Sequence, residues 1–143
     1  MISRAKPERF KEKFEVVSCF IEHDSKILLL HRQDYKPQGD TWGVPAGKVD
    51  KGETLPDAII REIKEEIELT IKPHELVFFD TFYVRYPEYD FIYHVFHTKL
   101  DKIPKLNLNP IEHKDYVWTT PSESLKMNLI PDEDFCIKAF YNV

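Results

Sequence analysis

Three glutamates within five residues have the types and spacing that could do chemistry. Glu62, Glu65 and Glu66 stand at positions i, i+3 and i+4, so a helix would bring their carboxylates to one side within about one turn. Like charges this close repel each other unless they point into water or a cation lies among them. Carboxylate oxygens suit the hard cations Mg²⁺ and Mn²⁺. Taken alone, such a cluster is more often a solvated helix face, here beside Arg61 and Lys64.

All the glycines of the chain precede this cluster in one segment. Gly39, Gly43, Gly47 and Gly52 fall within 14 residues. Glycine lets a backbone turn sharply and approach a ligand closely. Glu53 follows the last glycine and precedes the acidic segment. The glycine loop and the acidic segment therefore form one candidate site.

A helix must position the three carboxylates, and the sequence carries its signals. Thr54 can cap the helix, Pro56 suits its first turn, and Asp57 completes a variant of the capping box. Apolar residues then recur at every fourth position, at Leu55, Ile59, Ile63 and Ile67. One face of this helix is expected to pack on the rest of the protein, and the helix must end before Pro73.

Segments rich in aromatic and β-branched residues predict strands around this helix. The expected strands are a pair at 14–21 and 26–31, one brief strand near Trp42 and Val44, and strands at 76–84, 91–100 and 116–119. Helical segments are expected at 121–127 and 132–141. This order predicts an α/β (α+β) chain with a mixed sheet and helices packed on it. With no repeat or linker, residues 1–143 are expected to form a single domain.

Composition excludes several functions. The formal net charge is −5, from 20 Lys and Arg against 25 Asp and Glu, which disfavours a polymeric nucleic acid as partner. A mean hydropathy of −0.45 and the lack of a long apolar run argue against a membrane protein. Cys19 and Cys136 match no zinc or redox spacing and are expected to be buried. We therefore expect a cytoplasmic protein.

The joint spacing of the loop and the acidic helix resembles the box of the Nudix hydrolase family. Gly47 is followed after five residues by Glu53, and after seven more by Arg61-Glu62. Ile63, Glu65-Glu66 and Leu69 complete the pattern, and residues 42–46 (WGVPA) resemble the usual lead-in. The resemblance covers Gly47 to Leu69 and implies a Nudix-type α/β/α sandwich with a mixed β-sheet.

One position departs from the family pattern. Glu68 stands where the family normally has glycine, near the helix end, where glycine can take a left-handed conformation. A glutamate there meets the unfavourable end of the helix dipole. The expected consequence is a helix that continues to Thr70 or Lys72, with altered substrate access as the alternative.

The resemblance implies a metal-dependent hydrolase that cleaves a diphosphate linkage in a small nucleotide, with water attacking phosphorus. The cofactor would be Mg²⁺ or Mn²⁺. The implied metal ligands are Glu62, Glu66 and the Gly47 carbonyl, and the residues with implied catalytic roles are Glu53, Arg61 and Glu65. Among these, Arg61 would orient a box glutamate, and Glu53 would be a further ligand or a water activator.

The general base differs among family members and stays open. Glu112, which precedes the strand at 116–119, is the candidate for an acid from a later loop and joins the expected metal ligands; its alternative is an ordinary surface glutamate. The substrate could be a nucleoside triphosphate, a nucleotide-sugar or a dinucleoside polyphosphate, the last indicated weakly by Tyr86. No substrate-binding residue is assigned, and a homodimer is left open.

Two alternative functions also remain at this point. One is a nucleotide-sensing module that keeps the fold without turnover, for which Glu68 is the only indication. The other is attack at a sugar carbon, as in the GDP-mannose mannosyl hydrolases.

Overall fold

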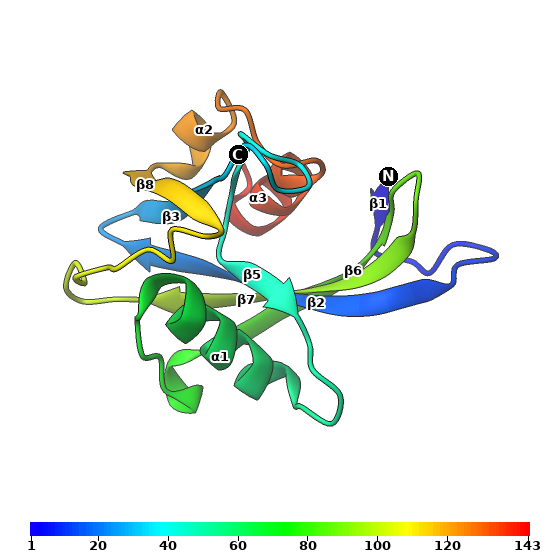
Figure 1. Ribbon diagram of the computed structural model, residues 1–143, viewed down its shortest axis with the longest axis horizontal. Coiled ribbons are helices and arrows are strands. Elements are labelled where there is room, and N and C mark those ends of the chain that lie inside the picture. The colour runs from blue at the N-terminus through cyan, green and yellow to red at the C-terminus, as the bar shows by residue number, and fades with distance from the viewer.

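The computed structural model describes residues 1–143 and consists of one mixed sheet with helices on both faces (Figure 1). The strands lie in the order β1 (Ile2–Ser3), β6 (Val77–Arg85), β7 (Asp90–Lys99), β2 (Glu12–His23), β3 (Lys26–Arg32) and β4 (Trp42–Gly43). Two further strands pair off this path: β5 (Ala46–Lys48) with β2, and β8 (His113–Thr119) with β3. β2 and β7 run parallel, and the other strand pairs are antiparallel. The expected α+β sandwich is confirmed.

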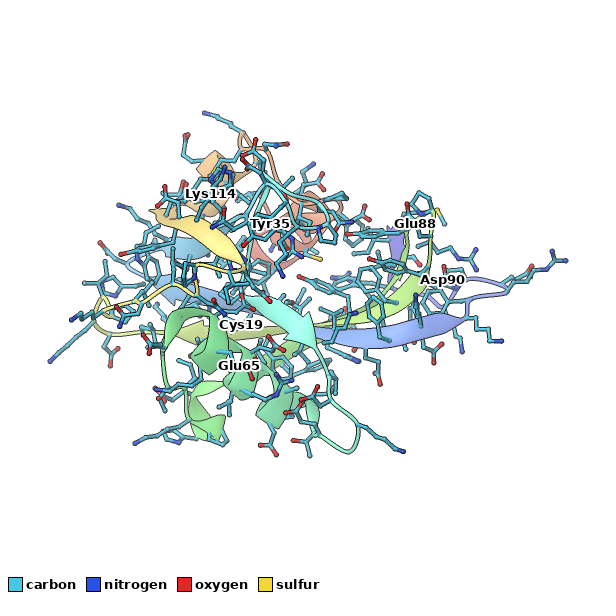
Figure 2. All side chains as sticks on the ribbon, in the orientation of Figure 1. Cys19, Tyr35, Glu65, Glu88, Asp90 and Lys114 are labelled. Carbon is cyan, nitrogen blue, oxygen red and sulfur yellow. The ribbon has the colours of Figure 1, made fainter.

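The sheet divides the hydrophobic core into two layers, and helices cover each layer. α1 (Leu55–Ile67), followed by the 3₁₀ turn η1 (Pro73–Glu75), covers one face; α2 (Pro121–Ser124) and α3 (Glu133–Tyr141) lie on the other (Figure 1). Because successive strand residues point to opposite faces, Cys19 on β2 packs with the buried residues of α1, while its neighbour Phe20 packs with Cys136 of α3 (side chains in Figure 2). Both cysteines are buried, as expected.

α1 follows the predicted signals at its start and departs from them at its end. The Thr54 hydroxyl accepts a hydrogen bond from the Asp57 amide at 3.2 Å, and the buried face includes Ile59, Ile63 and Ile67. The helix ends at Ile67, because Glu68 takes a left-handed conformation with φ 55°. The expectation of a helix running to Thr70 or Lys72 is therefore wrong: Glu68 terminates the helix as glycine would, at a backbone cost of about 1–2 kcal/mol.

Pairing between distant strands changes several predicted boundaries. The single brief strand expected near Trp42 is two strands, β4 on β3 and β5 on β2, separated around Pro45. β8 begins at His113 rather than at 116, because Arg32 of β3 pairs with His113. The helix expected at 121–127 is only the short α2. No helix is long and apolar enough to cross a membrane.

Candidate active site

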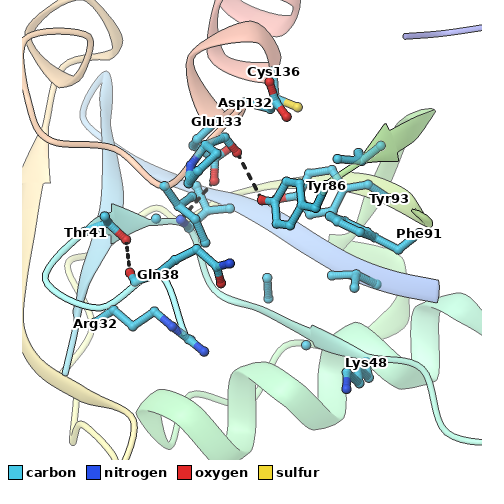
Figure 3. A pocket seen from close by; sticks show the side chains of 18 of the residues that line it. Arg32, Gln38, Thr41, Lys48, Tyr86, Phe91, Tyr93, Asp132, Glu133 and Cys136 are labelled. Atoms are coloured by element: carbon cyan, nitrogen blue, oxygen red, sulfur yellow. Dashed lines mark hydrogen bonds between the residues drawn. The ribbon is translucent and has the colours of Figure 1, made fainter. Parts of the chain in front are cut away.

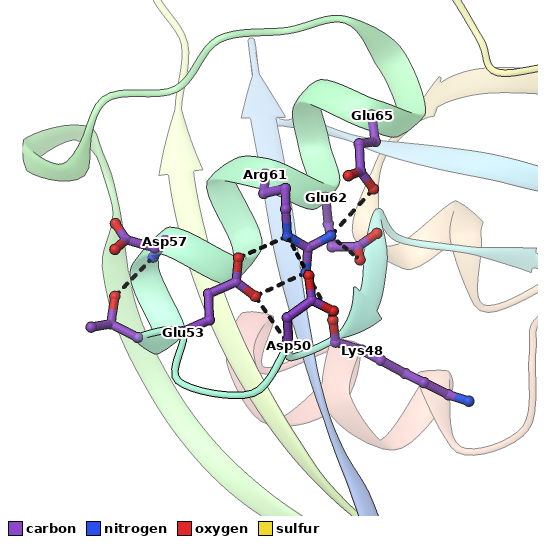
Figure 4. Close-up of polar contacts among 8 residues, drawn as sticks. Lys48, Asp50, Glu53, Asp57, Arg61, Glu62 and Glu65 are labelled. Carbon is purple, nitrogen blue, oxygen red and sulfur yellow. Dashed lines mark hydrogen bonds and ion pairs between the residues drawn. The ribbon is translucent and has the colours of Figure 1, made fainter.

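Arg61, in the middle of α1, organises acidic residues of this helix and of the loop before it (Figure 4). Its guanidinium donates to both oxygens of Glu53, at 2.7 and 2.9 Å, and to one oxygen each of Glu62 and Glu65, at 2.8 and 3.2 Å. It also donates to the Lys48 carbonyl of β5 at 3.0 Å. An ion pair with Asp50 at 3.4 Å brings the number of carboxylates around this one cation to four, and the network fixes the helix against the glycine loop.

Glu53 and Arg61 form the tightest pair of this network. The two hydrogen bonds from Arg61, together with one from the Asp50 amide, lower the pKa of the Glu53 carboxyl to about 2. The pKa of Arg61 is raised, chiefly by the same contact. Glu53 is therefore ionised at neutral pH and is a weak proton acceptor.

Gly47 lies directly against the Glu62 carboxylate. A Cβ atom at position 47 would lie 2.0 Å from the Glu62 Cδ and 2.1 and 2.4 Å from its two oxygens. A side chain at this position would displace the Glu62 carboxylate, so glycine permits the close approach of β5 to α1 seen here. The same contact brings the backbone of the glycine loop to the carboxylates of the helix.

Glu66 is the buried member of the cluster. Only 3% of this residue is exposed, and its Oε1 accepts from the Ala46 amide at 3.2 Å. Its Oε2 lies 3.8 Å from the Nδ1 of His113, and ligand atoms of Glu66, Glu112 and His113 all lie within 4.8 Å of one another. These three residues form the carboxylate–imidazole cluster.

The loop before β8 carries Glu112 to this position by covering the end of α1. The last carbonyls of a helix have no partner within the helix. Here the backbone carbonyl of Glu66 accepts a hydrogen bond from the backbone N–H of Asn109 at 2.9 Å, and that of Ile67 accepts one from the backbone N–H of Asn107 at 3.1 Å. The backbone N–H of Gln33, which follows β3, donates a hydrogen bond to the backbone carbonyl of Glu112 at 2.9 Å. Glu112 is therefore fixed over the helix that bears Glu66.

The electrostatics of the cluster favour a bound cation. Burial raises the pKa of Glu66 well above its usual value, and the charges of Glu62 and Glu112 add to this. Burial likewise raises the pKa of Glu62. Burial also lowers the pKa of His113 to about 4, so the imidazole is neutral at physiological pH, and its Nδ1 is buried without a hydrogen-bond partner. Crowded carboxylates and a neutral imidazole are metal donors.

A cavity of about 210 Å³ opens beside the cluster (Figure 3). Glu66 and His113 line it, together with the cationic side chains of Arg32 and Lys48. Its other lining is largely apolar or aromatic and includes Phe14, Val44, Tyr86, Phe91, Tyr93 and Ile130. Figure 3 shows Arg32 and Lys48 toward the α1 side and Glu133 at the start of α3. The cavity therefore joins a side that holds Glu66, His113 and Arg32 to an aromatic side, where the Lys48 Nζ lies 4.3 Å from the centroid of the Phe14 ring.

A family model described as the NUDIX domain matches residues 13–139 of the chain. The protein is a Nudix hydrolase. The CTP pyrophosphohydrolase of Escherichia coli K12 is 30% identical over 128 residues, which cover 88% of this chain and 90% of that protein. Family membership thus identifies the chain as a diphosphate hydrolase.

Solved structures share the Nudix fold. The solution structure of the E. coli ORF135 protein superposes with a TM-score of 0.75 at 28% identity, covering 90% of this chain and 89% of that one. A bifunctional NMN adenylyltransferase/ADP ribose pyrophosphatase from Francisella tularensis, complexed with AMP and a Mn ion, gives a TM-score of 0.75 at 25% identity, covering 94% of this chain and 42% of that one.

The structure brings most of the expected Nudix residues together, although their roles stay predictions. Gly47, Glu62 and Glu66 meet at the junction of β5 and α1, and Glu112 joins them from a distant loop. Glu65 keeps 56% of its side chain exposed and pairs with Arg61 at 3.2 Å. Glu53 faces Arg61 and lies outside the carboxylate–imidazole cluster.

Three side chains of the site carried no role in the sequence-based prediction. Arg32 follows the strand predicted at 26–31, a position where the sequence alone favours a surface side chain over a contact with substrate. His113 directly follows Glu112, which was the one available signal. Glu133 begins the terminal helix, and nothing in the sequence indicates that this glutamate is buried.

Proposed function

We propose that this Nudix hydrolase uses Mg²⁺ or Mn²⁺ to cleave the diphosphate linkage of a nucleoside triphosphate, with water attacking phosphorus. The observation that carries the proposal is that Glu66, which lines an aromatic-lined cavity, clusters with Glu112 and His113 and lies within reach of the charge of Glu62. Residues 1–143 would act together as one catalytic domain.

The residues present fit a hard divalent cation. Glu66 and Glu112 offer oxygen ligands, and the unpartnered Nδ1 of His113 lies beside them. The contact of Gly47 with the Glu62 carboxylate would bring the Gly47 carbonyl and Glu62 to the same ion. Such an ion would supply positive charge against the phosphates and would lower the pKa of a bound water molecule.

The protein side chains position the substrate and the acidic ligands. Arg32 lines the cavity, acts electrostatically on Glu66 and would neutralise phosphate charge that the acidic site would otherwise repel. Lys48 also lines the cavity, with its Nζ 4.3 Å from the centroid of the Phe14 ring. Arg61 holds Glu62 in place and restricts the motion of Glu53 and Glu65. Catalysis of this kind consists mainly of positioning and electrostatic stabilisation.

The proton of the attacking water needs an acceptor other than Glu53, because the Glu53 carboxyl has a pKa of about 2. Glu112 and Glu65 are the carboxylates that retain access to solvent, with side chains 39% and 56% exposed.

Replacing a metal ligand raises the metal concentration needed for half-maximal activity. Replacing the acceptor lowers kcat even at saturating metal, so Glu65→Gln and Glu112→Gln separate the two roles.

A nucleoside triphosphate is the preferred substrate for two reasons. The aromatic end of the cavity offers Tyr86, Phe91 and Tyr93 to a base, and Arg32 lies toward the end that holds Glu66. The relative that matches most of both chains is named for the hydrolysis of CTP. Nucleotide-sugars and dinucleoside polyphosphates place a second bulky group beyond the diphosphate and serve as comparison substrates.

The test is a panel of nucleoside triphosphates, nucleotide-sugars and dinucleoside polyphosphates, with identification of the products. We expect release of pyrophosphate or phosphate from triphosphates with Mg²⁺ or Mn²⁺, and none with excess EDTA. Thermal stabilisation by nucleotides without any hydrolysis would instead indicate a sensing module. Activity that persists in EDTA would overturn the assignment of a metal.

A further inference from the structure

His113 presents an unpartnered nitrogen to the Glu66 carboxylate. The imidazole is almost fully buried, with 8% of the side chain exposed, and its Nδ1 has no hydrogen-bond partner. This nitrogen lies 3.8 Å from the Glu66 Oε2, which is beyond the limit of about 3.2 Å for a hydrogen bond between nitrogen and oxygen. A buried polar atom left without a partner costs free energy unless a ligand satisfies it.

Asn109 holds the backbone of both residues. Its backbone N–H donates a hydrogen bond to the Glu66 carbonyl at 2.9 Å, and its backbone carbonyl accepts one from the N–H of His113 at 3.1 Å. His113 also begins β8 and pairs there with Arg32 of β3. The fold thus sets the separation of the imidazole and the carboxylate without a hydrogen bond between the two side chains.

This separation suits two ligands of one divalent cation. Ligand atoms that each lie about 2.1 Å from an ion are at most about 4.2 Å apart. The 3.8 Å between the Nδ1 of His113 and the Oε2 of Glu66 falls within this limit. The ligand atoms of the carboxylate–imidazole cluster all lie within 4.8 Å of one another, so a shift of about 0.6 Å (4.8 − 4.2) by the partly exposed Glu112 would complete the set.

The cationic side chains that act electrostatically on His113 bond elsewhere. They are Arg32 and Lys36. The Arg32 Nε donates to the Pro37 carbonyl at 2.6 Å, and the Lys36 Nζ pairs with Glu112 at 4.0 Å. Neither donates to Nδ1, so the lone pair of this nitrogen stays available to an ion.

We propose that the Nδ1 of His113 is a nitrogen ligand of the divalent cation that Glu66 and Glu112 bind, and that it biases the site toward Mn²⁺ over Mg²⁺. This inference rests on the proposed function, because it concerns the same metal site. Ligation through Nδ1 places the ring proton on Nε2. Mg²⁺ takes oxygen ligands, whereas imidazole suits transition-metal ions, so the nitrogen adds more to the binding of Mn²⁺.

Pulsed electron paramagnetic resonance of bound Mn²⁺ detects such a nitrogen directly. The untagged protein receives one equivalent of Mn²⁺ and no nucleotide, so that the protein supplies every nitrogen near the ion. We expect imidazole ¹⁴N modulation of the electron spin echo in the wild type, and its loss in His113→Asn and His113→Leu. Asparagine places an amide near the position of Nδ1 and offers the ion an oxygen in place of the imidazole nitrogen.

Calorimetry with each metal alone measures the bias. Replacing even an outer partner of a metal ligand costs about 10- to 100-fold in affinity, so His113→Leu should weaken Mn²⁺ binding by at least about tenfold. His113→Asn should weaken the binding of Mn²⁺ more than that of Mg²⁺, which lowers the ratio of the Mg²⁺ Kd to the Mn²⁺ Kd. His74→Asn, at an exposed histidine of η1, is the matched control and should follow the wild type.

Thermal unfolding without metal checks that the variants fold. His113→Leu should keep or raise Tm, because it removes a buried nitrogen that has no partner in the protein.

These measurements separate the inference from the proposed function. Imidazole modulation that both His113 variants lose supports the inference, even if no nucleotide is hydrolysed. Bound Mn²⁺ without ¹⁴N modulation would overturn it while leaving metal-dependent hydrolysis intact. Modulation that persists in a folded His113→Leu would overturn it too, since another histidine would then be the ligand. An unchanged ratio of the two Kd values in His113→Asn would contradict the bias toward Mn²⁺.

Discussion

Replacing Gly47 by alanine should disable the site while leaving the fold nearly intact. The new Cβ would lie 2.0 Å from the Glu62 Cδ, whereas ordinary contact begins at 3.4 Å. The carboxylate must therefore retreat by 3.4 − 2.0 = 1.4 Å. It is held by Arg61 at 2.8 Å, so this movement also disturbs the network that fixes the helix to the loop. A misplacement of this size costs on the order of 100-fold in rate.

The assay is kcat at saturating Mg²⁺, with thermal unfolding as a check on the fold. Gly47 does not have a positive φ, so alanine brings no backbone strain, and we expect a small change in Tm. Glu62→Asp shortens the side chain by about 1.5 Å, one carbon–carbon bond, which is enough to readmit the methyl group. The Gly47→Ala/Glu62→Asp double variant should therefore be no slower than Glu62→Asp alone.

Two results would refute this reasoning. One is a Gly47→Ala enzyme with wild-type kcat, because the steric conflict would then have no catalytic consequence. The other is a double variant whose loss equals the product of the two single losses, because independent effects would mean that the methyl group and the carboxylate do not compete for space.

Three further predictions concern the acidic residues. Glu66→Gln should abolish most of the activity yet keep or raise Tm without metal, since it removes the charge of a buried carboxylate; unchanged activity would place the metal elsewhere. Glu68→Gly should raise stability by about 1 kcal/mol, roughly 3 °C in Tm, by relieving the left-handed backbone, and an unchanged Tm would contradict this. Glu53→Gln should destabilise the protein at pH 7. Because folding lowers the Glu53 pKa from 4.5 to about 2, the stabilisation is present above pH 4.5 and is lost as pH falls toward 2. Denaturant unfolding of wild type and variant should therefore converge across that window, and a constant difference would refute the pairing with Arg61.

The parts of the site that depend on local sequence could be predicted. Thr54 caps α1, and the four-residue spacing of Ile59, Ile63 and Ile67 places their side chains in the core, because both effects act within a few turns of one helix. The glycine cluster likewise indicated a loop against the acidic helix, which the contact of Gly47 with Glu62 explains.

The remaining features depend on partners far away in the chain. Glu68 ends α1 in a conformation that glutamate rarely adopts, and no local rule favours this outcome over a longer helix. Glu112 reaches the box because the end of α1 binds the amides of a loop some forty residues later. The burial of Glu133 depends on the packing of α3 beside β4 and its contact with Val44, so its sequence neighbours gave no sign of it.

Product analysis in ¹⁸O-labelled water tests the central claim most directly. With CTP and Mg²⁺, water attack at phosphorus predicts that the label enters a phosphate group of CMP or of the released pyrophosphate, and that Glu66→Gln suppresses this incorporation. Label on a sugar carbon, or incorporation into phosphate that is undiminished in Glu66→Gln, would contradict the account.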